Sequence, residues 1–459
     1  MAYRTYSARI TYKIIQRLLL GFVQSPANAH GNKISVKNRF DVILVGAGPA
    51  GCAAARAFAL SGQSVALLEA DAAGKTKQRF AGEWLHPQGV DALQQLGFGE
   101  IVASVGRPRG RGFVVYPGHG ESPVKLDYVD GQIGLAFHHG ELVDEMRRIV
   151  ASTPGVSFFP GARVQSAHDE GVVLENGLRL AAKRVVGADG RASVVRRSLR
   201  GASVHKPISA MTGILLEGVK APYPDYGHVF LGQPSFLLGY EIAPSTVRIC
   251  VDVPLKYKAE MKDPAWLIEA IRDTLPPVWR QPAAEQIRKG QLSWQANHFL
   301  ARADYGNGHR ILIGDAAGHT HPLTATGITN GLVDAIELAA TRDFRSFVRS
   351  RRRACRVPEL LSRALYDCFS KEDAFSQSLR RAVVSLWRND ERERARTMGL
   401  LMGNGQSFLT FAGPFLKALW GAWKGRPNGR VDASDLASAA SWIRLPLAYA
   451  LAGLVKAKG

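Results

Sequence analysis

A glycine-rich turn near the start of the chain has the spacing that binds a pyrophosphate. Gly46, Gly48 and Gly51 form a GxGxxG pattern that directly follows the short apolar run 42–45. In such a turn the first glycine permits the tight bend, the second lets the backbone approach the phosphates, and the third lets the following helix pack closely on the strand. Glu69 ends the next apolar run, about 20 residues further on, where a carboxylate accepts hydrogen bonds from ribose hydroxyls. The chemistry indicated is the binding of a dinucleotide cofactor.

Two aspartates follow later apolar runs and favour FAD over NAD. Asp189 lies in the segment Val-Val-Gly-Ala-Asp-Gly, and Asp315 lies in Ile-Leu-Ile-Gly-Asp-Ala. A carboxylate such as that of Asp315, at a strand end, can accept a hydrogen bond from a ribitol hydroxyl. The helix that starts at Gly327 would direct its N-terminal amides at the pyrimidine edge of a flavin, which gains negative charge on reduction. FAD is therefore the expected cofactor.

The elements that must position these residues define an α/β fold. The apolar runs before the glycine turn and before each acidic residue are short and uniformly hydrophobic, as in parallel strands covered on both faces. We expect a Rossmann-like FAD-binding domain, an antiparallel β-sheet substrate domain and a helical C-terminal region. The predicted segments are 1–39, basic and amphipathic; 40–200, FAD-binding; 201–299, β-sheet; 300–345, FAD-binding; and 346–459, helical and a candidate membrane dock.

The chain is strongly basic, with a formal net charge of +20 over 459 residues. Such a surface attracts polyanions. No helix-turn-helix, zinc-finger or aromatic RNA-binding motif occurs, so we expect no nucleic acid partner and favour anionic lipid. Two segments support peripheral membrane association: the basic, apolar residues 1–39 and the arginine-rich residues 342–356. The first segment fits a transit-like presequence or a loose tail equally well.

The cysteines and histidines indicate neither a disulfide framework nor a metal site. The four cysteines lie too far apart for a CxxC motif and are interpreted as free thiols of a reducing compartment. His319 and His321 are close together in a glycine-rich loop without a carboxylate cluster, so no metal is expected. No apolar stretch reaches the roughly 20 residues that span a bilayer. We therefore expect a cytoplasmic protein, or one bound peripherally to the cytoplasmic face of a membrane.

Together these segments resemble the squalene monooxygenase (squalene epoxidase) branch of the flavoprotein hydroxylases. The most specific likenesses are Gly-Glu-Trp-Leu-His-Pro-Gln-Gly at 82–89, Phe-His-His-Gly at 137–140 and His-Pro-Leu-Thr at 321–324. The resemblance implies flavin contacts by Glu69, Arg79, Arg147, Asp189 and Asp315, and by the backbone around Gly327 and Ile328. It also implies candidate catalytic positions beside the flavin at Phe113, Pro322 and Thr324.

Two departures from the family pattern bear on the substrate. Ala325, Thr326 and Gly327 stand where the family has three glycines, which would narrow the space over the flavin. Phe113 stands where the family has a tyrosine, so a phenol that could form hydrogen bonds within the site is missing. Both changes argue against taking squalene itself as the substrate, and both leave the flavin in place.

The resemblance implies an FAD-dependent monooxygenase that acts on a lipophilic substrate, a terpenoid or a polyene. In such enzymes reduced flavin reacts with O2 to form a C4a-hydroperoxide, which delivers one oxygen atom to an alkene or an electron-rich carbon. Because no second GxGxxG follows, NADPH would supply electrons by binding transiently or through a partner flavoprotein reductase. Two alternatives stay open: a prenyl reductase of the geranylgeranyl type, and a non-catalytic, flavin-containing lipid-binding protein.

Overall fold

The computed structural model describes residues 39–72, 80–103, 109–118, 120–201, 206–403, 407–424, 438–442 and 444. The predicted amphipathic segment 1–39 lies outside the described residues except for Arg39, and the candidate flavin contact Arg79 also lies outside them. The described residues, from Arg39 onward, belong to one compact unit.

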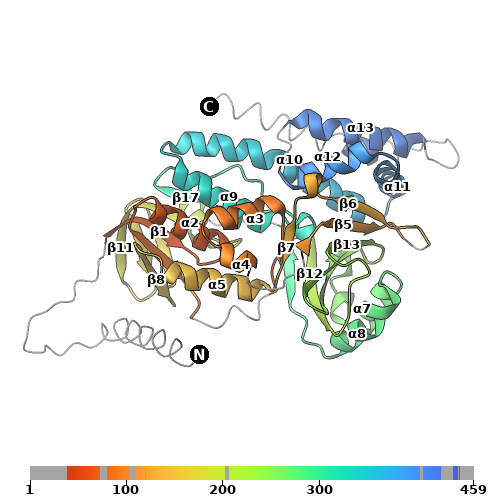
Figure 1. The fold of residues 1–459 in the computed structure, drawn as a ribbon, viewed down its shortest axis with the longest axis horizontal. Coiled ribbons are helices and arrows are strands. Elements are labelled where there is room, and N and C mark those ends of the chain that lie inside the picture. Colours follow the sequence, from red (N-terminus) through yellow and green to blue (C-terminus); the bar gives the residue numbers. More distant parts are fainter. Residues whose placement is uncertain are drawn as a thin grey trace, which may run out of the picture. The chain divides into compact units, whose positions relative to one another are not determined.

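The first sheet is built on five parallel strands. Their order is β8 (Val156–Pro160), β2 (Val65–Glu69), β1 (Arg39–Val45), β11 (Arg179–Gly187) and β17 (Arg310–Leu312). An antiparallel pair, β10 (Gly171–Leu174) and β9 (Val164–His168), extends the sheet beside the first half of β11. Helix α2 (Pro49–Leu60) packs beside this sheet against α5 (His139–Ala151) and α9 (Gly327–Ala340) (Figure 1). This cover explains why the apolar runs of β1 and β2 are almost wholly buried.

The carboxyl ends of four parallel strands meet at one edge of this sheet. In the register, Val45 lies beside Leu68 and Gly187, and Gly187 lies beside Leu312. Strand β1 leads into the glycine turn, β2 ends at Glu69, and β11 leads to Asp189 and helix α6 (Val194–Arg200). Strand β17 leads to the 3-10 turn η5 (Gly314–Ala316), which contains Asp315. Segments far apart in the sequence therefore share the edge at which parallel α/β sheets bind ligands.

The second sheet is mostly antiparallel. Its order is β16 (Trp294–Asn297), β12 (Ser209–Glu217), β15 (Thr246–Pro254), β14 (Phe236–Ala243), β13 (Tyr226–Leu231), β5 (Gly112–Tyr116) and β6 (Val124–Asp127). Only the β13–β5 pair among these is parallel. Helices α7 (Pro264–Arg272) and α8 (Pro277–Arg288) share a core with this sheet around the fully buried Trp279.

Strands β5 and β6 correct the predicted composition of the substrate sheet. They lie within residues 40–200, which the sequence analysis assigns to FAD binding, yet they pair with the second sheet. The alternation in β6, with Val124 and Leu126 buried and Lys125 exposed, predicts a strand but does not indicate its partner. The pairing of β5 with β13 joins segments far apart in the chain and follows from tertiary packing.

A small third sheet connects the two larger ones. It consists of β3 (Trp84–Leu85), β7 (Gly134–Ala136) and β4 (Arg109–Gly110), and β3 is followed by α3 (Pro87–Gln95) and α4 (Gly99–Ala103). Residues of this sheet contribute to both neighbouring cores: Leu85 and Leu135 to the flavin side, and Trp84 and Ala136 to the substrate side.

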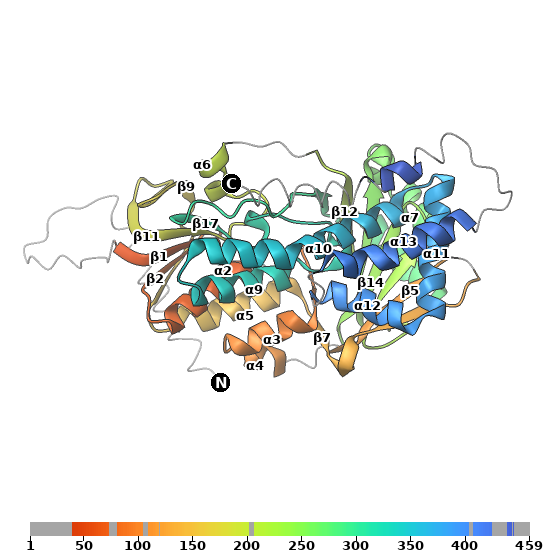
Figure 2. The ribbon, with the colours of Figure 1, turned by 90° about the horizontal axis from the view of Figure 1, so that it is seen from above.

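The described part of the C-terminal region is helical, as predicted. It contains α10 (Phe344–Ser370), α11 (Ala374–Asn389), α12 (Glu391–Leu401) and α13 (Phe408–Lys424). Helix α10 runs from beside α9 to the group formed by α11, α12 and α13 (Figure 2). These helices share a core with the second sheet that includes Phe236, Trp387 and Phe411. No helix among the described residues is long and apolar enough to cross a bilayer.

Candidate flavin and substrate site

A cavity of about 650 Å³ lies where the strand ends of the first sheet face the second sheet. Its size falls within the usual range for cofactor and ligand sites. Eight of the predicted cofactor residues line it: Gly46, Gly48, Glu69, Arg147, Asp189, Asp315, Gly327 and Ile328. Gly51 does not line the cavity, and Arg79 lies outside the described residues. The fold thus brings together segments that the sequence analysis identified separately.

The glycine turn has the shape of a phosphate cradle. Gly46 has a φ of 98°, which favours glycine, and a side chain there would collide with the Ala188 carbonyl. A Cβ on Gly51 would lie 1.8 Å from the Gly46 carbonyl oxygen, so this position requires glycine for packing. A Cβ on Gly48 would meet nothing within 4 Å, because this residue borders the open cavity at the start of α2. The turn therefore leaves room for a pyrophosphate at a helix N-terminus.

Glu69 and Arg147 hold this turn from the next strand and from α5. The Arg147 guanidinium donates to Glu69 Oε2 at 2.6 Å and, through Nε, to the Ala47 carbonyl oxygen at 2.8 Å. Glu69 Oε2 also accepts the Ala47 N–H at 3.0 Å. Both side chains are mostly buried, with 13% and 12% exposed. Arg147 therefore balances the charge of Glu69 and fixes the middle of the turn, while both residues keep a place on the cavity wall.

Asp189 combines a structural contact with an unpaired oxygen. Its Oδ2 accepts the Val194 N–H at 2.6 Å at the start of α6, and burial raises the pKa of the carboxyl. Its Oδ1 is buried and has no hydrogen-bond partner among the residues that the structure describes. Because Asp189 lines the cavity, a ligand hydroxyl can supply this partner. Together with the open face of Gly48, this orphan oxygen shows that the described residues fit a dinucleotide such as FAD.

The turn η6 (Pro322–Thr324) closes the cavity beside Gly327 and is anchored by His321. His321 Nδ1 accepts the Leu323 N–H at 3.1 Å, so Nε2 carries the hydrogen and lies 3.0 Å from Asp252 Oδ1. Ser209 and Asn297 bind the same carboxylate oxygen at 2.6 and 3.1 Å. These contacts attach the turn to strands β12, β15 and β16 of the second sheet.

The three predicted catalytic residues occupy different environments. Pro322 lines the cavity, as do Ala325 and Thr326 after it. Thr324 is buried outside the lining, and its Oγ1 has no partner among the described residues. Phe113 also lies outside the lining and packs against the ring of Trp84 at a centroid distance of 5.1 Å. The catalytic role of all three stays a prediction.

The ring of Phe113 lies 6.3 Å from that of Tyr128, measured between centroids, and the sequence analysis did not identify this phenol. His86 Nε2 donates to the Thr324 carbonyl at 2.8 Å, so His86 Nδ1 accepts the Tyr128 hydroxyl at 2.7 Å. The Tyr128 oxygen in turn accepts Trp84 Nε1–H at 3.0 Å. This buried hydrogen-bond chain ties η6 to β3, and burial lowers the pKa of His86 to about 4. His86 lies in the segment 82–89, which resembles the family, whereas no motif around Tyr128 indicates a role in the site.

The half of the cavity that faces the second sheet is largely apolar. Its lining includes Phe80, Trp84, Met211, Leu238, Tyr240 and Cys250. The acidic residue on this wall, Glu83, is paired with Arg248 through contacts of 2.8 and 3.1 Å. The Tyr240 hydroxyl lies 3.3 Å from Cys250 Sγ, and burial raises the pKa of both groups. A lipophilic molecule held here would meet few unsatisfied polar groups.

Comparison with known proteins agrees with this geometry. A sequence model of the squalene epoxidase family matches residues 181–417. Squalene epoxidase 3 of Arabidopsis thaliana is 30% identical over 392 residues, which cover 78% of this chain and 74% of that protein. The chain belongs to the squalene epoxidase family. Squalene monooxygenase of Mus musculus is 29% identical over 371 residues, which cover 74% of this chain and 64% of the mouse protein.

The fold recurs in a flavoprotein of known structure. HpxO of Klebsiella pneumoniae, solved with FAD and uric acid, superposes with a TM-score of 0.63 at 20% identity, covering 82% of this chain and 99% of HpxO. The predicted α/β fold class and the predicted family are confirmed. An FAD-dependent monooxygenase function, and thus an oxidoreductase, is confirmed at the level of the squalene epoxidase family.

Proposed function

We propose that this chain epoxidises a carbon–carbon double bond in a lipophilic terpenoid or polyene. The observation that carries the proposal is that one cavity is lined both by eight of the predicted cofactor residues and by the apolar wall of the second sheet. Bound FAD, once reduced, supplies the activation of O2 and the transfer of one oxygen atom to an alkene. The names of the relatives, squalene epoxidase and squalene monooxygenase, make a linear polyprene the first substrate to test.

The residues of the chain would bind and orient the substrate and keep water out. Phe80, Met211 and Leu238 would contact an isoprenoid chain by dispersion, and such contacts are favourable only when water leaves. The Glu83–Arg248 pair neutralises the charge next to this wall. Ala325 has a left-handed φ of 48° and lines the cavity beside Pro322, so its methyl group narrows the space that a glycine would leave. Branched or shorter polyprenes are therefore candidates beside squalene.

Oxygen labelling tests the reaction directly. Reconstituted protein is reduced and supplied with ¹⁸O2 and a series of polyprenes, and the products are analysed by mass spectrometry. We expect one ¹⁸O atom in each product. Leu238→Trp, which fills the apolar wall, should raise KM for the longest substrates and leave the affinity for FAD unchanged. Loss of double bonds without O2 would instead identify a prenyl reductase, and absence of turnover with every substrate would identify a non-catalytic lipid-binding protein.

We infer that NADPH supplies the electrons, directly or through a partner reductase. Arg191 and Arg197 line the cavity and contact the backbone carbonyls of Ala296 and Ala192. Neither forms an ion pair with an acidic residue that the structure describes, so both are suited to a nucleotide phosphate. Stopped-flow reduction of the bound flavin should be faster with NADPH than with NADH, and Arg197→Gln should remove this preference. Reduction only in the presence of an added flavoprotein reductase would refute the direct route.

We also propose that α13 binds peripherally to a membrane. Leu409, Leu416, Trp420 and Trp423 are 78%, 60%, 61% and 40% exposed, and their spacing places them on one face of the helix. Helix α10 adds the exposed arginines Arg345, Arg349, Arg352 and Arg353, which suit anionic head groups. A lipophilic substrate would reach the enzyme from such a surface.

Flotation with liposomes that contain phosphatidylserine tests this proposal. We expect the protein to float and the double variant Leu416→Ser with Trp420→Ser to stay at the bottom. Leu60→Ser is the matched control, because Leu60 is 62% exposed at the end of α2. Equal flotation of both variants, or no flotation of the unmodified protein at physiological salt, would contradict membrane binding by α13.

A further inference from the structure

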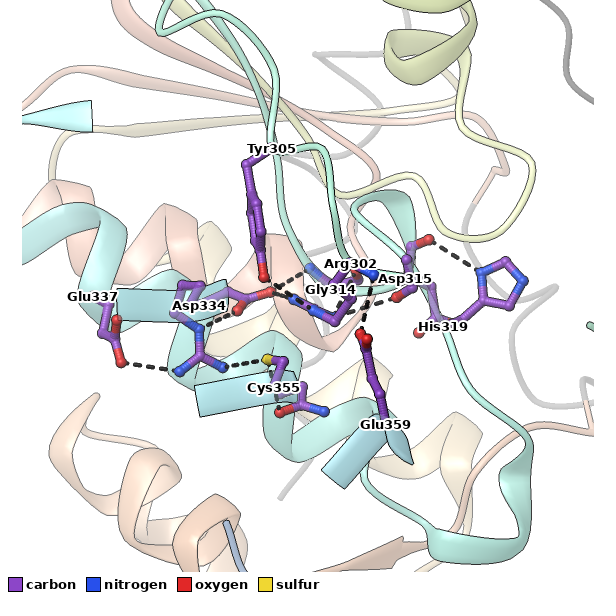
Figure 3. Close-up of polar contacts among 12 residues, drawn as sticks. Arg302, Tyr305, Gly314, Asp315, His319, Asp334, Glu337, Cys355 and Glu359 are labelled. Atoms are coloured by element: carbon purple, nitrogen blue, oxygen red, sulfur yellow. Dashed lines mark hydrogen bonds and ion pairs between the residues drawn. The ribbon is translucent and has the colours of Figure 1, made fainter. Parts of the chain in front are cut away.

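A buried group of charged residues lies behind the loop that carries Asp315. Arg302 is 5% exposed and does not line the cavity. Its guanidinium pairs with Asp334 of α9 (Figure 3). The second carboxylate oxygen of Asp334 accepts a hydrogen bond from Arg351 of α10 at 2.7 Å. Burying these charges is costly unless each one is paired and hydrogen-bonded. Because Arg302 does not line the cavity, its buried charge calls for an explanation other than direct contact with a ligand.

Arg302 holds both ends of the loop Gly314–Gly318. Its Nη1 donates to the Gly314 carbonyl at 3.1 Å and to the Gly318 carbonyl at 3.3 Å. Asp334 Oδ2, which pairs with Arg302, also accepts the Gly314 N–H at 2.8 Å. The loop is packed against Arg302 as well, since a Cβ on Gly318 would lie 2.8 Å from Arg302 Cγ. One side chain therefore contacts both ends of the loop.

The carbonyl groups between these ends are held by a second arginine. Arg196 of α6 donates to the Ala316 carbonyl at 2.8 Å and approaches the Asp315 carbonyl at 3.4 Å. With the backbone bound by Arg302 and Arg196, the Asp315 side chain is left on the cavity wall, beside Gly327. The position of the Asp315 carboxylate thus depends on the hydrogen bonds that Arg302 and Arg196 donate to the backbone of the loop.

Arg302 is also attached on the side away from the loop. Its backbone N–H donates to Glu359 Oε1 of α10 at 3.0 Å, and its Nε lies 3.5 Å from the Tyr305 hydroxyl. In Figure 3 the labelled Arg302 lies between Glu359, Asp334 and Gly314. Arg351 shares the Asp334 carboxylate and contacts Glu337 and Cys355, but it has no recorded contact with residues 314–318. Of these two buried arginines, Arg302 therefore contacts the loop that carries Asp315 and Arg351 does not.

We propose that Arg302 is a positioning residue for FAD binding, which holds the Gly314–Gly318 loop so that Asp315 faces the ribityl chain of the flavin. The proposal rests on the predicted contact between Asp315 and FAD. The planar guanidinium reaches two carbonyls and a carboxylate at once, whereas a lysine ammonium is a single point charge on a flexible stem. Arg302→Lys would keep the charge beside Asp334 and lose the geometry of the loop.

The test measures FAD affinity and apoprotein stability separately. FAD binding to Arg302→Lys, Arg302→Met and Arg351→Met apoproteins is followed by quenching of flavin fluorescence, and urea unfolding of each apoprotein is recorded. We expect Arg302→Lys to raise Kd for FAD at least about 10-fold with a modest loss of stability. Arg351→Met should lower stability more and change Kd less than about 3-fold. Because no substrate is present, the outcome does not depend on the proposed reaction.

A double-mutant cycle then asks whether Arg302 acts through Asp315. Asp315→Asn should also raise Kd, and Arg302→Lys should add less than about 3-fold in the Asp315→Asn background, since the contact it positions is already weakened. Wild-type FAD affinity in Arg302→Lys would overturn the proposal. So would full additivity of the two substitutions, an Asp315→Asn protein with normal affinity, or an equal rise in Kd for Arg351→Met. Arg302→Lys keeps the test decisive if Arg302→Met fails to fold.

Discussion

Removing the hydroxyl of Tyr128 should destabilise the protein far more than removing the hydroxyl of Tyr116. Tyr128→Phe leaves two buried groups without partners, Trp84 Nε1–H and His86 Nδ1. A buried polar group that loses its hydrogen bond costs about 1–3 kcal/mol, so with two such groups we expect the free energy of unfolding to fall by about 2–6 kcal/mol. The Tyr116 hydroxyl is buried and has no partner among the described residues, so Tyr116→Phe should change stability by less than about 0.5 kcal/mol or increase it.

Urea unfolding of the two apoproteins, followed by circular dichroism, measures this difference. His86→Gln is a useful companion, because a glutamine amide can accept from Tyr128 and donate to the Thr324 carbonyl as His86 does. It should therefore retain most of the stability that Tyr128→Phe loses. If Tyr128→Phe is no less stable than Tyr116→Phe, the buried hydrogen-bond chain contributes nothing and the reasoning is refuted.

The same variants give a pH dependence of known sign. Burial lowers the pKa of His86 from 6.5 to about 4, so the folded state disfavours the charged imidazole. The contribution of His86 to stability is complete above pH 6.5 and is lost as the pH falls toward 4. Relative to His86→Gln, the wild-type protein should lose about 3 kcal/mol across this window. A stability difference that does not change with pH would show that His86 titrates as an ordinary exposed histidine.

Further predictions concern the glycine turn and the buried acid of α10. The Gly48→Ala apoprotein should be as stable as wild type and bind FAD at least about 10-fold more weakly, because the added methyl group enters the phosphate cradle. Gly51→Ala should fail to fold, because its methyl group would lie 1.8 Å from the Gly46 carbonyl oxygen. Comparable unfolding midpoints for the two would contradict this. Burial raises the pKa of Glu359 from 4.5 to about 7, so wild type should lose about 3 kcal/mol relative to Glu359→Gln as the pH rises from 4.5 to 7. Urea unfolding of both proteins at pH 4.5 and pH 7 checks the sign. If wild type instead gains stability relative to Glu359→Gln as the pH rises, the pKa of Glu359 is not raised by burial.

Features within one continuous segment were predictable, because they depend on the local backbone. The glycine turn follows β1 and leads directly into α2, since only glycine tolerates the φ of Gly46 and the contact at Gly51. The end of β2 at Glu69 is equally local. The meeting of these ends with Asp315 was also predictable, because parallel strands that carry such motifs align their carboxyl ends.

Other contacts of the site depend on residues that carry no local signal. Tyr128 and His86 are 42 positions apart, and Arg302 meets Asp334 across 32 positions. A buried arginine, such as Arg302, and an exposed one look the same in a sequence, because burial depends on which elements pack around the residue. The packing of Phe113 against Trp84, next to the cavity, likewise depends on how the strands pair, and its predicted catalytic role stays a prediction.

The sequence by itself therefore determined the cofactor turn, the acidic residues that follow the strands around it and the family, because each of these depends on short segments with steric and hydrogen-bonding requirements of their own. Only the tertiary structure decided that β5 and β6 join the substrate sheet, that Tyr128 supplies the phenol behind η6, and that Arg302 holds the loop of Asp315. These are pairings between distant segments. Their energy exists only when both partners are buried together, so the chain must fold before either side chain acquires its role.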